Sequence, residues 1–487
     1  MKDNSNTAQA LWVALGSLAS FGFSIVSSMI LSRYFDKVDY GTYKQVMYVY
    51  NTLLFVFTLG LPKAYGYFLP RVKLEEGHSL VFKITMLFFI MGTFFSLILF
   101  TGASTIADIL NNPDLTTALR IFAIVPFFML PTMGIEAIYS TYRKTYINSI
   151  YVVCSRTFMI LCVVFPVIVL RGTSMHAILG FVVASSLDFL LAMYLKKRPF
   201  KGIEKNKTKV TYKEIFRFSL PLMMASFWGM IIKSADQFFI SRYFGEEVFA
   251  DFSNGFMELP FIGMIVGACS TVLFPLFSKI DHEGLDPKDV IYPIWMSVFK
   301  KTAMLIYPLL IVSWFFAEDI MTILYGQKYI TSFAYFRIIQ IANLFTLVSY
   351  APVILAIGKT KYYANVHMWS AIALVIVEFL AVKFIPSAIA IAFISVTCHI
   401  GRIFAMLVMV CKYFRVSFFQ LFPIKTMGLI LIPSIIFMMI YNICTDISNP
   451  LVNLLAGGTS YAIIYLIYSC FVGLDYRILI KPLIVRK

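Results

Sequence analysis

Four cationic side chains lie deep within stretches of sequence that are apolar enough to cross a membrane: Lys63, Arg156, Lys233 and Arg402. An Arg or Lys at the centre of a bilayer costs about 2.5–3.5 kcal/mol, so such a residue faces a partner or a water-filled cavity. Because the four come from different stretches, we expect them to line one shared polar cavity. An excess of positive charge suits an anionic substrate, and phosphate is the natural candidate because Arg and Lys both bind it well.

Acidic side chains accompany these cations within the apolar stretches. Asp236 follows Lys233 at i+3, and the two could form an ion pair on one helix face. Glu136 and Glu258 lie in two other stretches. For each charged residue taken alone, a structural role and a functional role both remain open.

The sequence carries no signature of an enzyme. It has no phosphate-binding glycine loop, no G-x-S-x-G and no H-E-x-x-H, and its five histidines and seven cysteines are scattered. We therefore predict no catalytic site, no metal site and no cofactor. The net charge of +16 does not indicate nucleic-acid binding, because the cations lie in short loops between apolar segments.

Composition indicates an all-α polytopic membrane protein. Hydrophobic residues form 60% of the 487 residues, charged residues form only 14%, and the mean hydropathy is +0.82. Period-two alternation is absent, which excludes a β-barrel. About 14 apolar stretches reach or approach the ~20 residues that span a bilayer as a helix. They cover residues 11–31, 45–69, 80–103, 117–140, 148–170, 174–195, 216–240, 248–276, 292–316, 333–357, 363–385, 387–411, 422–441 and 451–473.

Lys and Arg in the loops predict the orientation. If the N-terminus is cytoplasmic, 26 loop cations fall on the cytoplasmic side and 7 on the other. This bias places both termini in the cytoplasm. Nine of the 26 lie in the run from Lys196 to Arg217, which we interpret as a solvated linker that fixes the topology and touches anionic headgroups.

Four short matches in the same order relate the two sides of this linker. Ser-Arg-Tyr-Phe occurs at 32–35 and 241–244, Ile-Leu at 109–110 and 323–324, Arg-Ile at 120–121 and 337–338, and Lys-x-Tyr-x-Asn at 144–148 and 361–365. We predict two parallel six-helix repeats related by a pseudo-two-fold axis along the membrane normal. The repeats cover residues 1–195 and 216–411, with a basic cytoplasmic linker over 196–215. Two additional C-terminal helices and a tail cover 412–487.

Proline and glycine interrupt several of the apolar stretches. The second contains Gly60 and Pro62, the fourth contains Pro126, Pro131 and Gly134, and the eighth contains Pro260, Gly263 and Gly267. Such residues break or bend membrane helices where protein or a cavity meets the freed backbone groups. A simple kink that improves packing explains any single case equally well.

Several segments resemble the multidrug/oligosaccharidyl-lipid/polysaccharide (MOP) exporter superfamily, and within it the Wzx-type polysaccharide or O-antigen flippases. They are LSRYFDKVDYGTYKQV (31–46), LGLPKAYGYFLPRV (59–72), FRFSLPLMMASFWGMIIKSADQFFISRYFG (216–245) and ILYGQKYITSFAYFRI (323–338). The resemblance covers nearly the whole chain. Its motifs are diffuse, so they identify the family better than the substrate.

The resemblance implies a transporter in a bacterial inner membrane. Such proteins move an undecaprenyl-diphosphate-linked oligosaccharide from the cytoplasmic to the periplasmic leaflet by alternating access, for O-antigen, capsule or exopolysaccharide biosynthesis. Lys63, Arg156, Lys233 and Arg402 would then receive the diphosphate and sugar. Asp236, Glu136 and Glu258 would set the local charge or bind a coupling H⁺ or Na⁺. Other partners would be the lipid bilayer and polysaccharide polymerase machinery.

Three alternatives compete with this interpretation. A cation-coupled multidrug exporter of the same fold would favour an acidic cavity, whereas the deep charges here are largely cationic. A membrane polysaccharide polymerase or ligase would need a sizeable periplasmic loop, and the outer loops are short. A structural scaffold would explain neither the repeat nor the deep charges.

Overall fold

The computed structural model describes residues 6–348, 350–474 and 476, and its regular elements are all helices within that part of the chain. Contacts divide the protein into two compact units, residues 1–250 and 251–487. The division falls inside the long helix α11 (Tyr212–Gly255), which follows the basic linker and packs mainly with the first unit. The repeat boundary at 196–215 concerns sequence similarity and stays a prediction.

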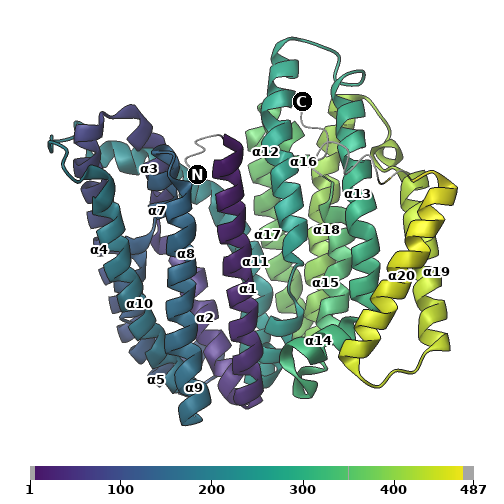
Figure 1. The fold of residues 1–487 in the computed structure, drawn as a ribbon, viewed down its shortest axis with the longest axis horizontal. Coiled ribbons are helices and arrows are strands. Elements are labelled where there is room, and N and C mark those ends of the chain that lie inside the picture. Colours follow the sequence, from purple (N-terminus) through teal and green to yellow (C-terminus); the bar gives the residue numbers. More distant parts are fainter. Residues whose placement is uncertain (1–5, 349, 475, 477–487) are drawn as a thin grey trace. The chain divides into compact units, whose positions relative to one another are not determined.

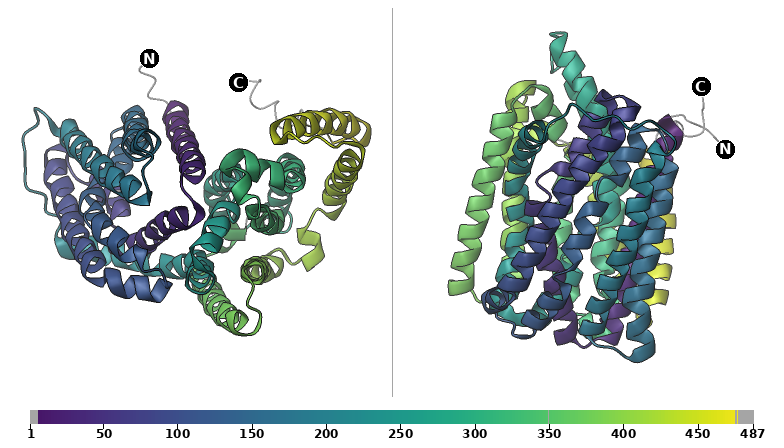
Figure 2. Two further views of the ribbon diagram at one scale, coloured as in Figure 1. Left: turned by 90° about the horizontal axis from the view of Figure 1, so that it is seen from below. Right: turned by 90° about the vertical axis from the view of Figure 1, so that its left-hand side faces the viewer.

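The first unit is a bundle of long helices with interrupted neighbours (Figure 1; Figure 2, right). Its long helices lie side by side along one common direction. Besides most of α11, it contains α1 (Asn6–Tyr34), α2 (Lys37–Phe57), α3 (Leu61–Phe68), α4 (Leu74–Leu110), α5 (Asp114–Phe122), α6 (Val125–Met129), α7 (Ile135–Thr141), α8 (Thr145–Met159), α9 (Phe165–Leu170) and α10 (Ser174–Lys197). Short 3₁₀ turns follow α3, α6 and α10, and a π turn at Ile160–Val164 joins α8 to α9.

The second unit is also a helical bundle, built around an aromatic core that includes Trp295, Phe299 and Phe414. Its helices are α12 (Pro260–His282), α13 (Ile291–Phe315), α14 (Ala317–Tyr325), α15 (Ser332–Thr346), α16 (Tyr350–Ala356), α17 (Thr360–Phe384), α18 (Ala388–Phe414), α19 (Ile424–Cys444) and α20 (Pro450–Val472). α17 ends and α18 begins on either side of Pro386, as the sequence predicts. The last two helices, α19 and α20, form a neighbouring pair (yellow in Figure 1).

Interrupted spans occur where the sequence places proline and glycine. α2 and α3 meet at a bend of 45°. Gly60 adopts a left-handed conformation there (φ 69°), which glycine reaches at little cost, and Pro62 lies in the first turn of α3. Gly134 (φ 92°) separates α6 from α7 in the same way. In the eighth stretch the outcome differs, because the chain breaks at residues 256–259 and Pro260 begins α12 instead of bending it.

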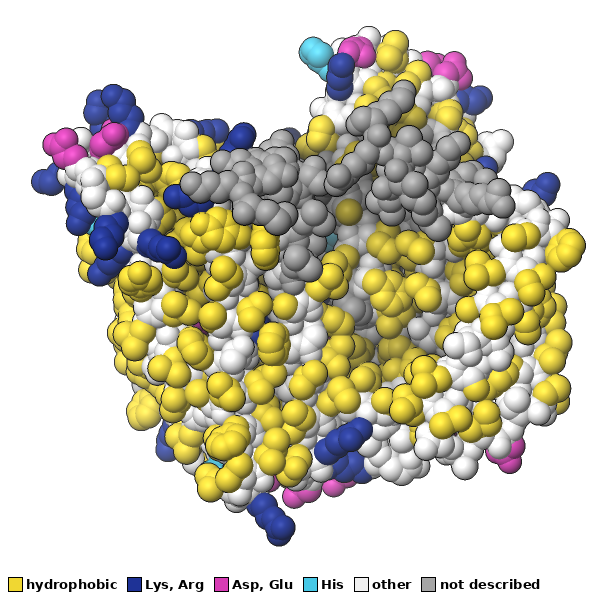
Figure 3. Space-filling model, in the orientation of Figure 1, with side chains coloured by type: hydrophobic (Ala, Val, Ile, Leu, Met, Phe, Trp, Pro, Cys, Tyr) yellow, Lys and Arg dark blue, Asp and Glu magenta, His cyan; other side chains and the backbone are white. Residues whose placement is uncertain are grey.

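The chain is a multi-span membrane protein. Ten described helical segments are long and apolar enough to cross a membrane, or thirteen if each of three bent pairs is one span. The predicted number of fourteen stays a prediction. Figure 3 shows hydrophobic side chains covering the sides of the helices, whereas Lys, Arg, Asp and Glu gather at the helix ends. This distribution is the one that a hydrocarbon slab between two aqueous phases requires.

A close helix contact fixes the π turn of the first unit. Gly180 of α10 packs directly on this turn, and a Cβ at that position would overlap the carbonyl oxygen of Cys162. π turns within α-helices leave backbone carbonyls that need an accommodating neighbour, and they are frequent near functional sites. The turn begins four residues after Arg156, so Gly180 contributes to the position of that side chain.

Candidate functional site

The four predicted cavity cations lie in different local environments. Lys63 in α3, Arg156 in α8 and Lys233 in α11 are exposed on the first unit, whereas Arg402 in α18 of the second unit is half-buried. Three of them belong to one unit and the fourth to the other. Their convergence on one cavity therefore remains a prediction.

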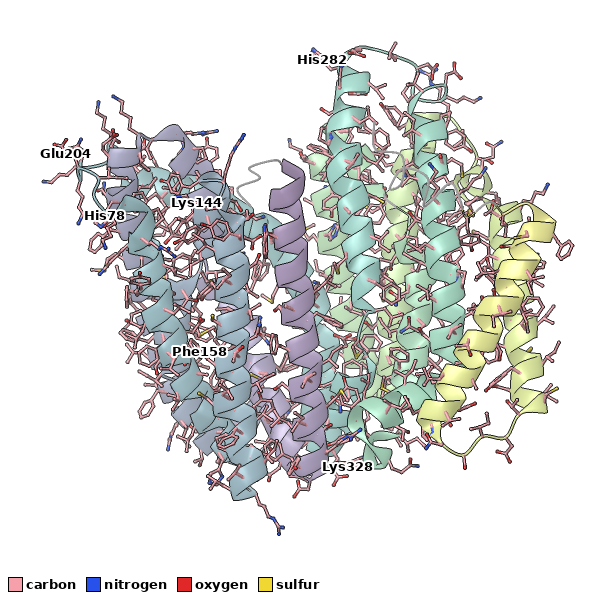
Figure 4. The ribbon with its side chains drawn as sticks, viewed as in Figure 1. His78, Lys144, Phe158, Glu204, His282 and Lys328 are labelled. Atoms are coloured by element: carbon pink, nitrogen blue, oxygen red, sulfur yellow. The ribbon has the colours of Figure 1, made fainter. Side chains whose placement is uncertain are left out.

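Arg156 belongs to a polar cluster between α1, α8 and α10. Its Nε donates a hydrogen bond to the Oγ of Ser20 at 2.9 Å. Nearby, the Oδ2 of Asp188 accepts a hydrogen bond from the hydroxyl of Tyr151 at 3.0 Å, and Arg156 lies within electrostatic reach of both groups. In Figure 4, the labelled Phe158, two residues after Arg156, lies at mid-height of the column formed by α8, the π turn and α9, far from Lys144 at its start. The cluster therefore sits deep within the spanning region.

Asp188 is the acidic residue that motif reasoning did not select as a site. It is 1% exposed, and its Oδ1 has no hydrogen-bond partner among the described residues. Burying a carboxylate is costly unless it is paired or protonated. In the sequence, Asp188 is an isolated Asp in an apolar stretch. This pattern indicates that the residue lies deep in the membrane, but it does not reveal that Tyr151 and Arg156 are its neighbours.

Arg402 belongs to a second polar cluster, between α15, α16, α17 and α18. Its Nη2 lies 3.0 Å from Nδ1 of His399, and Nε2 of His399 lies 3.3 Å from Oγ1 of Thr346. The phenol groups of Tyr350 and Tyr363 are within electrostatic reach of the guanidinium. The buried Nε of Arg402 has no hydrogen-bond partner in the described part of the chain. The guanidinium is thus held by His399 and by a side-chain hydrogen bond with Tyr350, and its Nε is the donor that remains for an anionic or hydroxylated ligand.

Asp188 and Arg402 occupy corresponding positions on two helices. Each lies fourteen residues after the first residue of its helix, α10 for Asp188 and α18 for Arg402. An acid in one unit and a cation in the other therefore lie equally far along their own helices.

The three predicted cavity acids differ in exposure. Asp236 in α11 is 5% exposed, and its charge reaches the phenol of Tyr48 in α2. Glu136 in α7 is exposed, and so is Glu258, which lies in the non-helical segment between α11 and α12. Their roles stay predictions, but burial distinguishes Asp236 from the other two.

Lys196 is a further residue that sequence reasoning missed. We interpreted it as the first solvated cation of the linker, but it is the penultimate residue of α10 and only 3% exposed. Its Nζ donates to the hydroxyl of Tyr65 (3.0 Å), the Oγ1 of Thr85 (3.3 Å) and the carbonyl of Pro131 (2.7 Å). A Lys-Lys pair at the end of an apolar stretch gives no signal that one of the two is buried.

A polar latch joins α2 to α11 at the opposite end of the first unit. The latch consists of the buried residues Thr42, Gln45, Asn112 and Ser241. Asn112 donates to Gln45 and Thr42, and Gln45 donates to the Oγ of Ser241 at 2.9 Å. Ser241 is the serine of the second Ser-Arg-Tyr-Phe string. Beside the latch, a Cβ on Gly41 would overlap the carbonyl of Glu246, so the helices touch backbone to backbone.

These features define a polytopic helical membrane protein with charged and aromatic clusters inside its spanning helices. A family model described as "Polysaccharide biosynthesis protein" matches residues 7–281. This covers more than half of the chain, and the protein belongs to that family.

Two relatives support the assignment. The succinoglycan biosynthesis transport protein ExoT of Rhizobium meliloti (strain 1021) is 23% identical over 65% of this chain and 62% of ExoT. The capsular polysaccharide biosynthesis protein CapF of Staphylococcus aureus is 24% identical over 56% of this chain and 69% of CapF. The match thus spans about three fifths to two thirds of these relatives.

Solved structures confirm the fold. The lipid II flippase MurJ in an inward closed conformation aligns with a TM-score of 0.71 over 97% of this chain and all of MurJ, at 16% identity. An inward-facing multidrug resistance MATE family transporter of the MOP superfamily aligns with a TM-score of 0.66 over 84% of this chain and 98% of its own, at 10% identity. The fold that the resemblance to the MOP superfamily implied is confirmed.

Proposed function

We propose that the protein is a flippase that moves an undecaprenyl-diphosphate-linked oligosaccharide from the cytoplasmic to the periplasmic leaflet of a bacterial inner membrane. The observation that carries the proposal is the combination of a polysaccharide biosynthesis family with a fold shared along nearly its full length with a lipid flippase. The product would feed O-antigen, capsule or exopolysaccharide assembly, with polymerase machinery as a downstream partner. The protein itself makes and breaks no covalent bond in this role.

The substrate has two ends with opposite solvent preferences. A diphosphate and its sugars cannot cross ~30 Å of hydrocarbon unaided, while a prenyl tail prefers lipid. A cationic groove would hold the head while the tail stays in the bilayer. Lys63, Arg156, Lys233 and Arg402 are the proposed ligands of the head, and the aromatic neighbours of Arg402 suit contact with a sugar ring. If the cytoplasm is electrically negative, outward movement gains about 2.3 kcal/mol per negative charge for each 100 mV.

Alternating access between two parallel six-helix repeats is the proposed mechanism, with both termini in the cytoplasm. The matched strings occupy corresponding helix ends, which supports the repeat. The first Ser-Arg-Tyr-Phe string closes α1 and the second precedes the break of α11 at Gly245, while the Lys-x-Tyr-x-Asn strings begin α8 and α17. The latch between α2 and α11 would then be the periplasmic gate in its closed state.

A coupling ion, H⁺ or Na⁺, would act at a buried carboxylate. Asp188 fits this role best, because it is buried, has an unpartnered oxygen in the described structure and lies beside Arg156. Asp236 is the second candidate. The exposed Glu136 and Glu258 would adjust the surrounding charge.

Replacing Lys63 or Lys233 by Ala is expected to lower export of the lipid-linked glycan at least tenfold. The physical reason is the loss of one charge-assisted hydrogen bond to the diphosphate, worth about 1.5–3 kcal/mol. Surface polysaccharide in cells that depend on each variant measures the effect, with membrane insertion checked in parallel. Lys201→Ala is the control, since Lys201 is exposed in the linker. Normal export by both variants would contradict the cationic groove.

Replacing Gly41 by Leu is expected to open the latch, because the new side chain collides with the backbone at Glu246. The probe is Ser241→Cys in a protein whose native cysteines have been replaced. We expect this cysteine to react with a membrane-impermeant maleimide about tenfold faster when Gly41→Leu is also present than when it is absent. Gly22→Leu is the control, since a side chain at Gly22 meets no atom within 4 Å. Unchanged labelling would show that the latch is not a gate.

The experiment that tests the function is purification in a mild detergent followed by mass spectrometry of the bound lipid. Recovery of a prenyl-diphosphate oligosaccharide would support the flippase and identify the glycan. Selective recovery of cationic amphiphiles would instead support a cation-coupled multidrug exporter of the same fold.

A further inference from the structure

A side pocket of about 500 Å³ lies between α4 and α10, and its lining includes none of the four proposed substrate cations. It is lined by His78, Val81, Phe82, Thr85, Met86, Phe89, Met193, Lys196 and Lys197. The volume falls in the range of about 300–1,000 Å³ that is typical of small-molecule sites. The pocket lies where α4 begins and α10 ends, next to the basic linker. In Figure 4, His78 lies just below Glu204 of that linker.

The floor of the pocket is formed by the buried amine of Lys196, which no described carboxylate contacts. All three N–H bonds of Lys196 are used on neutral oxygens, and its Nζ also lies over the ring of Tyr65 at 4.9 Å. With these three acceptors, Lys196 has no donor left over, so hydrogen bonds to a ligand must come from the rim of the pocket.

The rim of the pocket supplies the free donors. Lys197 is exposed, and its charge and that of Lys205 both reach the imidazole of His78. The linker is folded over this rim, because the amide of Asn206 donates to the carbonyl of Glu75 at 3.0 Å and Lys83 donates to the carbonyl of Val210 at 2.8 Å. These contacts hold the basic segment beside the pocket.

The wall of the pocket is apolar and turned toward lipid. Phe82 is 60% exposed and Met86 is 43% exposed on α4, within the part of the helix that spans the bilayer. Figure 3 shows this pattern at the level of whole side chains, with Lys and Arg of the first unit gathered at one end above a hydrophobic band. A ligand here has an anionic head at the rim and a hydrocarbon part along the wall.

We propose that this pocket binds the headgroup of an anionic phospholipid of the surrounding leaflet. Its phosphate would accept hydrogen bonds from Lys197 and His78 at the rim, and its acyl chain would lie along Phe82 and Met86. Basic pockets between membrane helices are a recurrent way to hold such headgroups. The bound lipid would fasten the linker to the end of α4.

The test is native mass spectrometry of the full-length, delipidated protein titrated with phosphatidylglycerol or phosphatidylethanolamine. We expect wild type to bind one phosphatidylglycerol with at least tenfold preference over phosphatidylethanolamine. His78→Gln/Lys197→Gln should lose at least about tenfold in affinity, because it removes the charge-assisted hydrogen bond from Lys197 and the imidazole donor of His78. The control is His282→Gln/Lys201→Gln, which changes the same residue types at exposed positions outside the pocket. It should bind like wild type, and size-exclusion profiles should show that both variants are folded.

Three results would overturn the proposal. One is equal phosphatidylglycerol binding by wild type and His78→Gln/Lys197→Gln. Another is equal binding of the zwitterionic and anionic lipids by wild type. The third is displacement of phosphatidylglycerol by undecaprenyl diphosphate, which would assign the pocket to the transported lipid. The readout does not depend on transport, so the flippase proposal and this one can fail separately.

Discussion

Replacing Arg402 by Gln is expected to reduce glycan export about a hundredfold or more. Arg402 is held by His399 and Tyr350 and keeps a buried Nε without a partner in the described structure. A guanidinium in this position can bind a diphosphate through two parallel hydrogen bonds, and losing them costs about 3 kcal/mol or more. Lys restores the positive charge but not the two parallel donors of a guanidinium. Export by Arg402→Lys should therefore fall between export by wild type and by Arg402→Gln. Surface polysaccharide in cells that depend on the variant is the measurement.

The matched control for this experiment is Arg415→Gln. Arg415 follows α18 and pairs with Asp286 at 3.7 Å on an exposed surface, where an ion pair contributes little. It should export at the wild-type level. Equal export by Arg402→Gln and wild type would remove Arg402 from the substrate path and leave it a structural role.

Replacing Gly180 by Val is expected to destabilise the protein by about 3 kcal/mol or more, at the upper end of overpacking effects. The new side chain would overlap the backbone of the π turn at Cys162 and Val163, and backbone cannot move aside as a side chain can. The monodisperse fraction after detergent extraction, and its midpoint of thermal aggregation, should both fall. Even a small folded remainder should export poorly, because the turn positions Arg156.

Gly458→Val tests whether the effect is local. Gly458 lies in the spanning helix α20, and a Cβ there meets nothing within 4 Å. It should extract like wild type. A similar loss from both substitutions would mean that glycine in a spanning helix matters for reasons other than the contact with the π turn.

The asymmetry of charge between corresponding helices bears on the mechanism. In the proposed repeat, α10 corresponds to α18. These helices carry Asp188 and Arg402, and each of the two residues has its own aromatic or histidine partner. In the proposed flippase, Arg402 binds the diphosphate of the transported lipid and Asp188 binds the coupling ion. The two helices would then perform different parts of the transport cycle, α18 binding the substrate and α10 the coupling ion.

Local properties of the chain could be predicted from the sequence alone. The spanning segments follow from the length of their apolar runs, and the boundary between α17 and α18 follows from Pro386. The bend between α2 and α3 follows from Gly60 and Pro62. The neighbourhood of His399 and Arg402 follows from their i,i+3 spacing on one helix face. Each of these depends on residues within one or two helical turns.

Contacts between helices were decided only by the tertiary structure. Lys196 meets Tyr65 across 131 residues of chain, and Tyr151 meets Asp188 across 37. Hydropathy gives the depth of a residue but not the direction in which its helix face points. That direction is set by close contacts such as Gly180 on the π turn and Gly41 on α11. For this reason the sequence indicated the family and the spanning segments, while packing determined which charges are buried and which remain free to bind.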